Sequence, residues 1–323
     1  MELRHLRYFL AIAEEGNFTR AAARLGIGQP PLSQQIKDLE AEVGARLFHR
    51  VPHGAELTAA GRAFLEGVKN IPPQTASAVR AARRASRGET GRLKLGFTGT
   101  AALNPIVPAC IRKFRHAYPD VEIGLEEANS AALVAGLLDG RLDVAVLRPS
   151  AADPPELLYH TLSVETLVAV LPAAHPRAID GDDVDLASLG EDPLVLTPRA
   201  LGASLHDAAL AACRNAGFEP VLGQSAPQIA SILSLVSAEQ GVSLVPEYLR
   251  QFNIAGVVFR KIRGTPPTVE LAVALQRTRP PPPAHNFASL ARSVSPSDVR
   301  DQDSDEVTGP SGRVKTNLPA SDP

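Results

Sequence analysis

The chain has 323 residues, of which 44% are hydrophobic and 21% charged, a composition typical of a soluble globular protein with two or three domains and a sizeable core. Its formal net charge is −2, so the overall charge gives no indication that the protein binds nucleic acid. Any affinity for nucleic acid must come from a local cluster of positive charge. Aromatic residues make up 4% and tryptophan is absent, which argues against platforms that stack single-stranded nucleic acid.

Helical periodicity marks the start of the chain. Apolar side chains recur every three or four residues between Leu3 and Ala13, which predicts one buried helix face, and Gly16 ends this helix. Thr19 is expected to cap a second helix, Arg20–Leu25, through its hydroxyl. The first two elements are therefore predicted to be short helices joined by a tight turn.

A third helix is predicted after a glycine-containing turn at residues 26–28. Pro30 and Pro31 fit its first positions, where a missing N–H costs nothing. Apolar side chains at helical spacing carry it to about Val43, and Gly44 ends it. Two helices joined by such a turn are the core of a helix-turn-helix motif.

A hairpin and a long helical segment are predicted next. Residues 47–58 are expected to form the hairpin, since proline and glycine interrupt them between apolar anchors. Residues 58–87 are Ala-rich and helical, and Pro72 and Pro73 are expected to kink or split them. The later, basic part of this segment is expected to be a solvated helix that pairs with a second chain. The alternative is that its basic side chains contact DNA phosphates directly. Its basic residues are Arg80, Arg83, Arg84 and Arg87.

Strand patterns alternate with helical patterns between residues 92 and 275, which predicts a mostly parallel sheet with covered faces. We expect two small sheets with a cleft between them. The predicted fold class is multidomain, α and α/β. The expected parts are a winged helix-turn-helix head (1–60), a linker helix (61–90) and an α/β domain (91–277), whose subdomains comprise about 91–162 with 266–277, and about 163–265.

Residues 278–323 are predicted to form a disordered, proline-rich tail. They include four consecutive prolines, Pro280–Pro283, a single aromatic residue and a final acidic stretch that contains Ser and Pro. Phe287, Leu290 and Ala291 are spaced to form one last helical turn.

The third helix has the composition of one that reads DNA. The second helix of a helix-turn-helix lies in the major groove with its first residues on base edges. Glutamine suits bidentate contact with adenine, serine bonds a base or a phosphate, and the free N–H groups of a helix start favour phosphate. The candidate DNA-binding residues are Thr19, Arg20, Gln29, Pro30, Pro31, Ser33, Gln34, Lys37, Arg50 and His53.

The charge of this head is close to balanced. Residues 1–65 carry eight Lys and Arg against seven Asp and Glu, a net charge of +1. A lone head is therefore expected to bind DNA weakly, and dimerisation is needed to sum enough phosphate contacts. The alternative is a small-molecule-binding module whose helical head only mediates assembly.

The identities of these residues resemble the LysR-type transcriptional regulators. The matching positions are Phe18, Thr19, Ala21, Ala22, Leu25, Gln29, Pro30, Leu32, Ser33, Ile36, Leu39, Glu40, Gly44, Leu47, Phe48 and Arg50, then Leu57, Thr58, Ala60 and Gly61. The resemblance covers about residues 1–275, with specific motifs only in the first 65.

Two positions depart from the family pattern. Gly28 replaces the usual Ser or Thr cap, and His53 stands in the wing where Arg is common, which weakens one expected backbone contact or makes it pH-sensitive.

The resemblance implies a transcription factor that binds double-stranded DNA at interrupted palindromic sites as a homo-oligomer, a dimer or a tetramer. It implies that a small-molecule effector changes the angle between the DNA-binding heads, with RNA polymerase as a further candidate partner. No cofactor is implied.

The resemblance also implies a periplasmic-binding-protein-like effector domain with its ligand in the interdomain cleft. The residue pattern agrees, because ligands of open α/β sheets bind at the carboxyl ends of strands. At such an end, the Arg148 guanidinium is expected to fork onto a carboxylate. The predicted effector is a small carboxylate, with aromatic carboxylates included because the sequence resembles benzoate- and muconate-sensing members. The candidate effector residues are Thr98, Gly99, Thr100, Asn129, Ser130, Arg148, Pro198, Arg199 and Pro227.

Other classes of protein are disfavoured. The eight histidines are scattered, and no nucleophile elbow, phosphate loop or dinucleotide fingerprint is present, so neither an enzyme nor a metal site is expected. Cys110 and Cys213 lie in apolar helical patterns and are expected to stay reduced. The absence of a signal-peptide pattern and of a long apolar run predicts a cytoplasmic protein.

Overall fold

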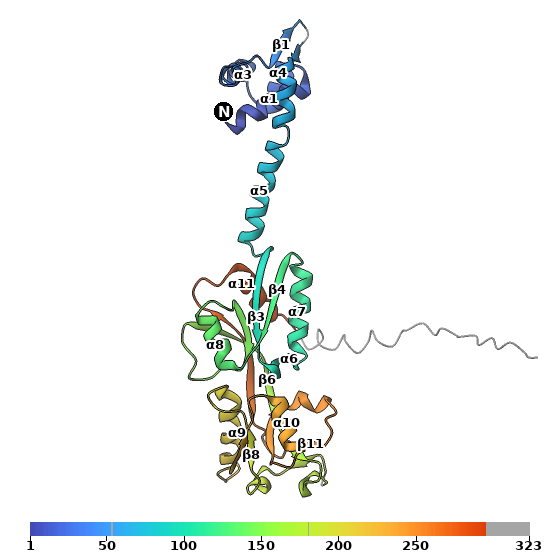
Figure 1. Cartoon of the computed structure of the whole chain (residues 1–323), viewed down its shortest axis with the longest axis vertical. Helices are drawn as coiled ribbons and strands as arrows, with labels where there is room; N and C mark the ends of the chain where they lie inside the picture. The colour runs from blue at the N-terminus through green and yellow to red at the C-terminus, as the bar shows by residue number, and fades with distance from the viewer. Residues whose placement is uncertain (53, 180, 295–323) are drawn as a thin grey trace, which may run out of the picture. The chain divides into compact units, whose positions relative to one another are not determined.

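The computed structural model describes residues 1–52, 54–179 and 181–294. The chain divides into two compact units, the first formed by Met1–Arg84 and the second beginning at Ala85 (Figure 1). Each unit has its own hydrophobic core.

The first unit is a small helical domain with a two-stranded hairpin. Its elements are α1 (Leu3–Glu15), α2 (Phe18–Leu25), α3 (Gln29–Val43), β1 (Phe48–Val51), β2 (Gly54–Leu57), α4 (Ala59–Val68) and α5 (Ile71–Ser86). Phe9 of α1 is fully buried, and its ring centroid lies 5.2 Å from that of Phe48 and 5.0 Å from that of Phe64. These aromatic contacts join α1 to the hairpin and to α4, and the predicted winged helix-turn-helix arrangement is confirmed.

The start of α2 differs from the prediction. The side chain of Asn17 accepts hydrogen bonds from the backbone N–H groups of Thr19 (2.8 Å) and Arg20 (3.1 Å), so Asn17 is the cap and Thr19 lies inside the first turn. Asparagine is as good a helix cap as threonine, and Asn17, two residues before Thr19, is the residue that caps this helix. The turn that follows uses Gly26 in a left-handed conformation, with φ of 67°.

The linker segment is split as predicted. The hydroxyl of Thr58 accepts a hydrogen bond from the Gly61 N–H (2.9 Å) and caps α4. Helix α4 ends at Val68, and α5 begins at Ile71 with both predicted prolines in its first turn, where they break no helical hydrogen bond. No residue of α5 is buried.

The second unit is a two-part α/β domain. Its elements are β3 (Gly91–Phe97), α6 (Gly99–Ala102), α7 (Ile106–Ala117), β4 (Val121–Glu127), α8 (Ser130–Leu138), β5 (Val144–Leu147), β6 (Leu157–Pro172), η1 (Pro176–Ala178), β7 (Asp183–Val184), η2 (Leu186–Leu189), β8 (Leu194–Leu196), α9 (Ala203–Asn215), β9 (Leu222–Ser225), α10 (Ile229–Ser237), β10 (Ser243–Pro246), η3 (Glu247–Gln251), β11 (Val257–Ile262), β12 (Thr268–Gln276) and α11 (Pro282–Ala291).

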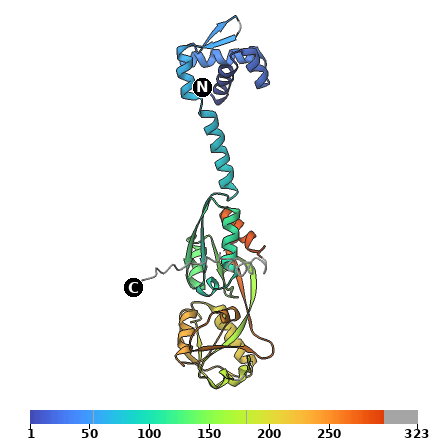
Figure 2. The same ribbon diagram turned by 90° about the vertical axis from the view of Figure 1, so that its right-hand side faces the viewer.

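The prediction of two separate, mostly parallel sheets is wrong, because the main sheet is continuous and mixed. One mixed sheet has the strand order β4-β3-β5-β12-β6-β11-β7, and β10 also pairs with β6. Strands β3, β4 and β5 are parallel, whereas β12 is antiparallel to both β5 and β6. The 16-residue β6 and the long β12 run through both halves of the domain and join their sheets (Figures 1 and 2).

The two halves have separate cores and are called subdomains I and II here. Subdomain I contains β3 to β5, the first part of β6, the end of β12 and α11, and its core includes Phe114 and Val146. Subdomain II contains the elements from the second part of β6 to the start of β12. There Leu167, Ala169 and Leu171 pack in one cluster, and the alternate residues Val168 and Val170 pack in another. Both faces of β6 are therefore buried in subdomain II, which explains its unbroken apolar sequence.

Part of the predicted disordered tail is a core helix. In α11 the side chain of Phe287 is fully buried, and its ring centroid lies 5.4 Å from that of Phe114 on α7. Of the four prolines that suggested disorder, Pro282 and Pro283 occupy the first turn of α11, where prolines fit, and Pro281 is its cap residue. The prediction of disorder is wrong for Pro282–Ala291, and the rest of the predicted tail from residue 295 lies outside the described residues.

Candidate functional site

One face of α3 packs in the core and the other is available to a partner. Leu32, Ile36 and Leu39 are buried against α1 and α2. Because a helix repeats every 3.6 residues, the intervening side chains point outward. The exposed predicted residues on this face are Gln29, Pro30, Pro31, Gln34 and Lys37, and Ser33 is half-buried.

Polar contacts hold several of these side chains in place. The amide of Gln29 donates to the Ser33 hydroxyl (3.2 Å), and the amide of Gln34 donates to the Asp38 carboxylate (2.8 Å). From α1, a ring nitrogen of the buried His5 lies 3.0 Å from the side-chain oxygen of Gln35. The polar face of α3 is thus tied both along its own length and to the neighbouring helix.

The other predicted DNA-binding residues lie on α2 and the hairpin. Thr19 and Arg20 are exposed at the start of α2, and the Arg20 guanidinium donates to the backbone oxygen of Glu15. On β1 the Arg50 guanidinium lies 5.4 Å from the centroid of the Phe18 ring, a cation–π distance. His53 lies outside the described residues.

A cavity of about 490 Å³ lies between the two subdomains. This volume is within the range of small-molecule sites. Seven of the nine predicted effector residues line it: Thr98, Gly99, Thr100, Asn129, Ser130, Arg148 and Pro227. Further lining residues, outside the nine candidates, are Ala102, Leu103, Glu127, Ala128, Thr197, Leu201, Gly202, Ser204, Leu205, Gln228, Ile229 and Ala230.

Four helices begin at this cavity. In α6 the hydroxyl of Thr98 accepts from the Ala101 N–H (3.2 Å) and caps the helix. In α8 the side chain of Asn129 accepts from the Ala132 N–H (2.9 Å) and caps the helix. The cap positions of α9 and α10 are Gly202 and Gln228, and neither makes a side-chain cap hydrogen bond. The first N–H groups of a helix have no acceptor within the helix, so the starts of α9 and α10 offer donors and a partial positive charge to an anion.

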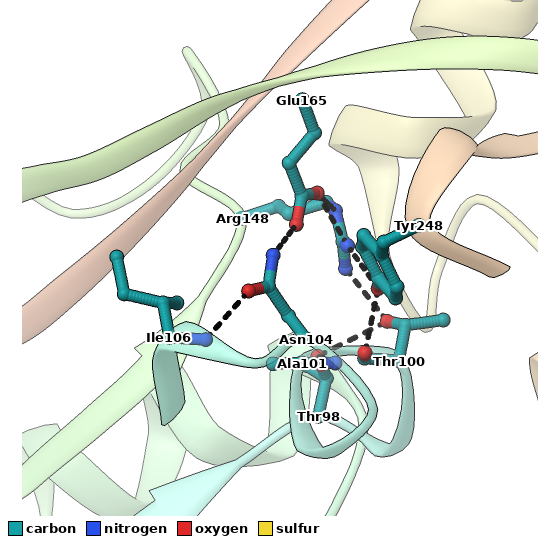
Figure 3. A network of polar contacts seen from close by, with 8 residues as sticks. All are labelled: Thr98, Thr100, Ala101, Asn104, Ile106, Arg148, Glu165 and Tyr248. Carbon is teal, nitrogen blue, oxygen red and sulfur yellow. Dashed lines mark hydrogen bonds and ion pairs between the residues drawn. The ribbon is translucent and has the colours of Figure 1, made fainter. Parts of the chain in front are cut away.

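Arg148 is engaged within the protein, contrary to the expectation that its guanidinium forks onto the effector (Figure 3). Its Nε and Nη2 both donate to Oε2 of Glu165, at 2.9 and 2.6 Å, and both side chains are about 5% exposed or less. Nη1 donates to the Thr100 hydroxyl (2.6 Å), and Nη2 also donates to the Tyr248 hydroxyl (3.2 Å). Four of its five N–H groups are used.

The charge of this arginine is compensated in the same network. Burial alone would lower the pKa of the Arg148 guanidinium, but the neighbouring Glu165 carboxylate holds that pKa above its usual value. The second carboxylate oxygen of Glu165 accepts from the Asn104 amide (2.7 Å). A buried ion pair of this kind is stable because its remaining polar atoms also have partners.

Besides the contact of Arg148 with Tyr248, two hydrogen bonds connect the subdomains beside the cavity. The Tyr248 hydroxyl on η3 donates to the Thr100 backbone oxygen on α6 (2.6 Å), and burial raises the pKa of Tyr248 to about 12, so this hydroxyl keeps its proton. The Ala131 N–H on α8 donates to the Leu201 backbone oxygen (3.3 Å). The cleft is therefore bridged from α6 and from α8.

Two predicted effector residues do not line the cavity. Pro198 and Arg199 follow β8, and the exposed Arg199 guanidinium makes a bidentate ion pair with Asp207, with both N···O distances 2.8 Å. One signal in the sequence could have indicated Glu165, because it is a charged residue directly before an apolar stretch of strand. Glu127 lies at the carboxyl end of β4, two residues before the predicted Asn129, so the same strand-end signal applied to it. Tyr248 carried no local signal, because only the folding of the chain brings it beside the cavity.

The two cysteines lie in different cores, Cys110 in subdomain I and Cys213 in subdomain II, and both are buried. Over the ranges 1–52, 54–179 and 181–294, no three His, Cys, Asp or Glu residues are grouped to hold a metal ion. Across the same described ranges, no helix has the length and apolarity needed to cross a membrane.

Two family models match the chain. The model described as "Bacterial regulatory helix-turn-helix protein, lysR family" matches residues 3–62, and the "LysR substrate binding domain" model matches residues 86–296. Together they cover both units.

Curated relatives and solved structures are similar over most of the chain. The uncharacterized HTH-type transcriptional regulator YnfL of Escherichia coli K12 is 42% identical over 79% of this chain and 85% of its own length. The HTH-type transcriptional regulator AlsR of Bacillus subtilis is 35% identical over 90% and 95%. The crystal structure of full-length CbnR complexed with its target DNA has a TM-score of 0.72 and 29% identity, covering 93% of this chain and 100% of that one.

Proposed function

The chain belongs to the LysR family of bacterial helix-turn-helix transcriptional regulators, and from this we propose that it regulates transcription in response to a small carboxylate bound between its two subdomains. It is a DNA-binding regulator and not an enzyme, as its named relatives are transcriptional regulators. The effector, the DNA contacts and the assembly described below are parts of the proposal.

The observation that carries the proposal is the cavity with two uncapped helix starts in its wall. A carboxylate there accepts hydrogen bonds from the first N–H groups of α9 and α10 and from the hydroxyls of Thr100 and Ser204. Arg148 contributes its one remaining N–H rather than a bidentate fork, because Glu165 occupies the fork.

The proposed DNA contacts follow from the exposed face of α3. Gln29, Ser33 and Gln34 read base edges in the major groove, and the remaining contacts position the backbone. Those positioning residues are Thr19, Arg20, Pro30, Pro31, Lys37, Arg50 and His53. With a head charge of only +1 over residues 1–65, two or more heads must bind together, which supports a dimer or tetramer.

Effector and DNA are coupled in this proposal through the bridged cleft. A ligand shifts a conformational equilibrium only by binding one arrangement better than the other. The hydrogen bonds Tyr248–Thr100 and Ala131–Leu201 form only when the subdomains lie at the distance seen here. A ligand that contacts both walls therefore favours this arrangement over a more open one.

A thermal-shift screen of small carboxylates, with and without amino groups, tests the effector on the full-length protein. A ligand at 100 times its Kd stabilises the native state by about 2.7 kcal/mol, which a melting curve resolves. Ser204→Ala is expected to weaken binding about fivefold by removing one hydrogen bond. Ser188→Ala, on η2 away from the cavity, is the matched control.

Failure of every carboxylate to stabilise the protein would contradict the proposed effector class. The alternative function, a ligand-binding module whose head only mediates assembly, makes a different prediction. In that case the protein would not retard DNA from upstream of its own gene in a gel shift at any salt concentration.

A further inference from the structure

The charges that line the cavity do not balance in favour of an anion. Arg148 is the one cationic side chain among the lining residues, and its charge is compensated by the buried Glu165. The other charged lining residue is Glu127. The wall therefore carries an uncompensated negative charge, although two helix starts in the same cavity favour a carboxylate.

Glu127 is positioned to act on a ligand. It ends β4 beside Phe97, and its carboxylate lies over the backbone of Gly99 at the start of α6. A Cβ at position 99 would come within 2.7 Å of the Glu127 Oε1, so glycine leaves the space in which this carboxylate rests. Among the described residues, the carboxylate of Glu127 has no hydrogen-bond or ion-pair partner, and this residue is exposed in the cavity wall.

Negative and positive features lie on opposite walls. Glu127 belongs to subdomain I, whereas the uncapped starts of α9 and α10 belong to subdomain II. A ligand with only a carboxylate would meet the donors of subdomain II and repulsion from Glu127. A ligand with a positive group as well would be attracted by both walls, and the attraction would grow as closure excludes water.

We propose that the effector is an amino carboxylate, whose ammonium group pairs with Glu127 while its carboxylate binds the N-terminal N–H groups of α9 and α10. This inference rests on the proposed function and narrows its ligand class. It also gives a reason for the ligand to close the cleft, because its two charges are held by different subdomains.

The test compares matched ligands on the full-length protein by isothermal titration calorimetry. Three sets are used: L-leucine with 4-methylpentanoate and 3-methylbutylamine, L-phenylalanine with 3-phenylpropanoate and 2-phenylethylamine, and 2-aminomethylbenzoate with benzoate and benzylamine. Within at least one set, the amino carboxylate is expected to bind tenfold or more tightly than either partner that lacks one charged group.

Glu127→Gln removes the charge and keeps the shape of the side chain. In this variant the preference for the amino carboxylate over the plain carboxylate is expected to fall to about twofold or less. Glu122→Gln is the matched control, since Glu122 is an exposed glutamate on the same strand outside the cavity. It is expected to keep the wild-type preference.

The outcomes separate this inference from the proposed function. If plain carboxylates bind as tightly as their amino counterparts in every set, the amino-carboxylate inference is overturned and the carboxylate effector stands. If the preference exists but survives Glu127→Gln, the assignment of Glu127 is overturned. If none of the nine compounds binds and the carboxylate screen is also negative, both proposals fail.

Discussion

The hydroxyl of Tyr248 lies 2.6 Å from the backbone oxygen of Thr100, and this hydrogen bond joins subdomain II to the cavity wall of subdomain I. The same hydroxyl accepts a hydrogen bond from Arg148. A single side chain thus connects the relative position of the subdomains to the buried ion pair beneath the cavity (Figure 3). Any ligand that contacts Thr100 acts on a segment already tied across the cleft.

Tyr248→Phe is expected to loosen this connection. Removing the hydroxyl loses about 1 kcal/mol, so the bridged segments should open about fivefold more often. Hydrogen–deuterium exchange should rise at α6 and at η3, the two elements that the bond joins. In the control Tyr159→Phe, the lost hydrogen bond is to Asp153 within subdomain I, so exchange at both segments should stay unchanged. Unaltered exchange in Tyr248→Phe would show that the bond does not hold the cleft.

The Arg148–Glu165 pair is expected to be strongly coupled. Removing either partner leaves a buried charge uncompensated, so Arg148→Met and Glu165→Gln should each lower the free energy of unfolding by about 3 kcal/mol. In urea unfolding, the loss of unfolding free energy in the double variant should be smaller than the sum of the two single losses by about 2 kcal/mol. The exposed pair Arg199–Asp207 serves as the control and should show much weaker coupling. Additive losses at Arg148 and Glu165 would argue against this pairing.

Base contacts and phosphate contacts on α3 should separate experimentally. Gln34→Ala is expected to weaken binding to the specific site by about 1–3 kcal/mol and to leave non-specific binding nearly unchanged. Lys37→Ala should weaken both and reduce the slope of log K against log salt by about one. Lys261→Ala, in the second unit, is the control. An equal loss on specific and random DNA for Gln34→Ala would assign it to the backbone instead.

The thiol of Cys213 should be unreactive in the folded protein. Burial raises its pKa to about 11, so at pH 8 the folded state holds roughly 100-fold less thiolate than an unfolded chain with an ordinary thiol. Alkylation by iodoacetamide, followed at this residue by peptide mass spectrometry, should be at least that much slower without urea than with it. Equal rates would contradict the burial of this residue.

The same shift predicts the pH dependence of stability. Because the folded state keeps the Cys213 proton to higher pH than the unfolded state, the free energy of unfolding should decrease as pH rises from about 9 towards 11. Cys213→Ala should remove this part of the decrease. A decrease of unchanged size in that variant would assign it to other groups.

Local features of the sequence predicted the first unit well. The helices of the helix-turn-helix are marked by short-range periodicity and by Gly26, whose positive φ the turn requires. The error at Thr19 arose because Asn17, two residues earlier, is an equally good cap. Helix α11 was predicted only as a single turn at Phe287, Leu290 and Ala291, because consecutive prolines suggest a loop, although the first turn of a helix tolerates them.

Non-local pairing explains the remaining differences. Nothing in the sequence states that β6 and β12 run antiparallel through both subdomains, and this pairing makes the sheet continuous. The ends of β3, β4 and β5 placed six of the predicted residues at the cavity, since parallel strands end at one edge, and Pro227 reaches it from the end of β9. Arg148 pairs with Glu165, which lies 17 residues further along the chain. This ion pair leaves Arg148 without a free bidentate face for a ligand.

The most direct test of the account is a DNA-binding titration with and without effector. Fluorescence anisotropy of a labelled fragment from upstream of the protein's own gene is measured at fixed salt, together with a nuclease footprint. The compound that stabilises the protein most in the carboxylate screen is expected to change the affinity or the footprint of wild-type protein. A compound that saturates the cavity and leaves both the affinity and the footprint unchanged would contradict a ligand-responsive regulator.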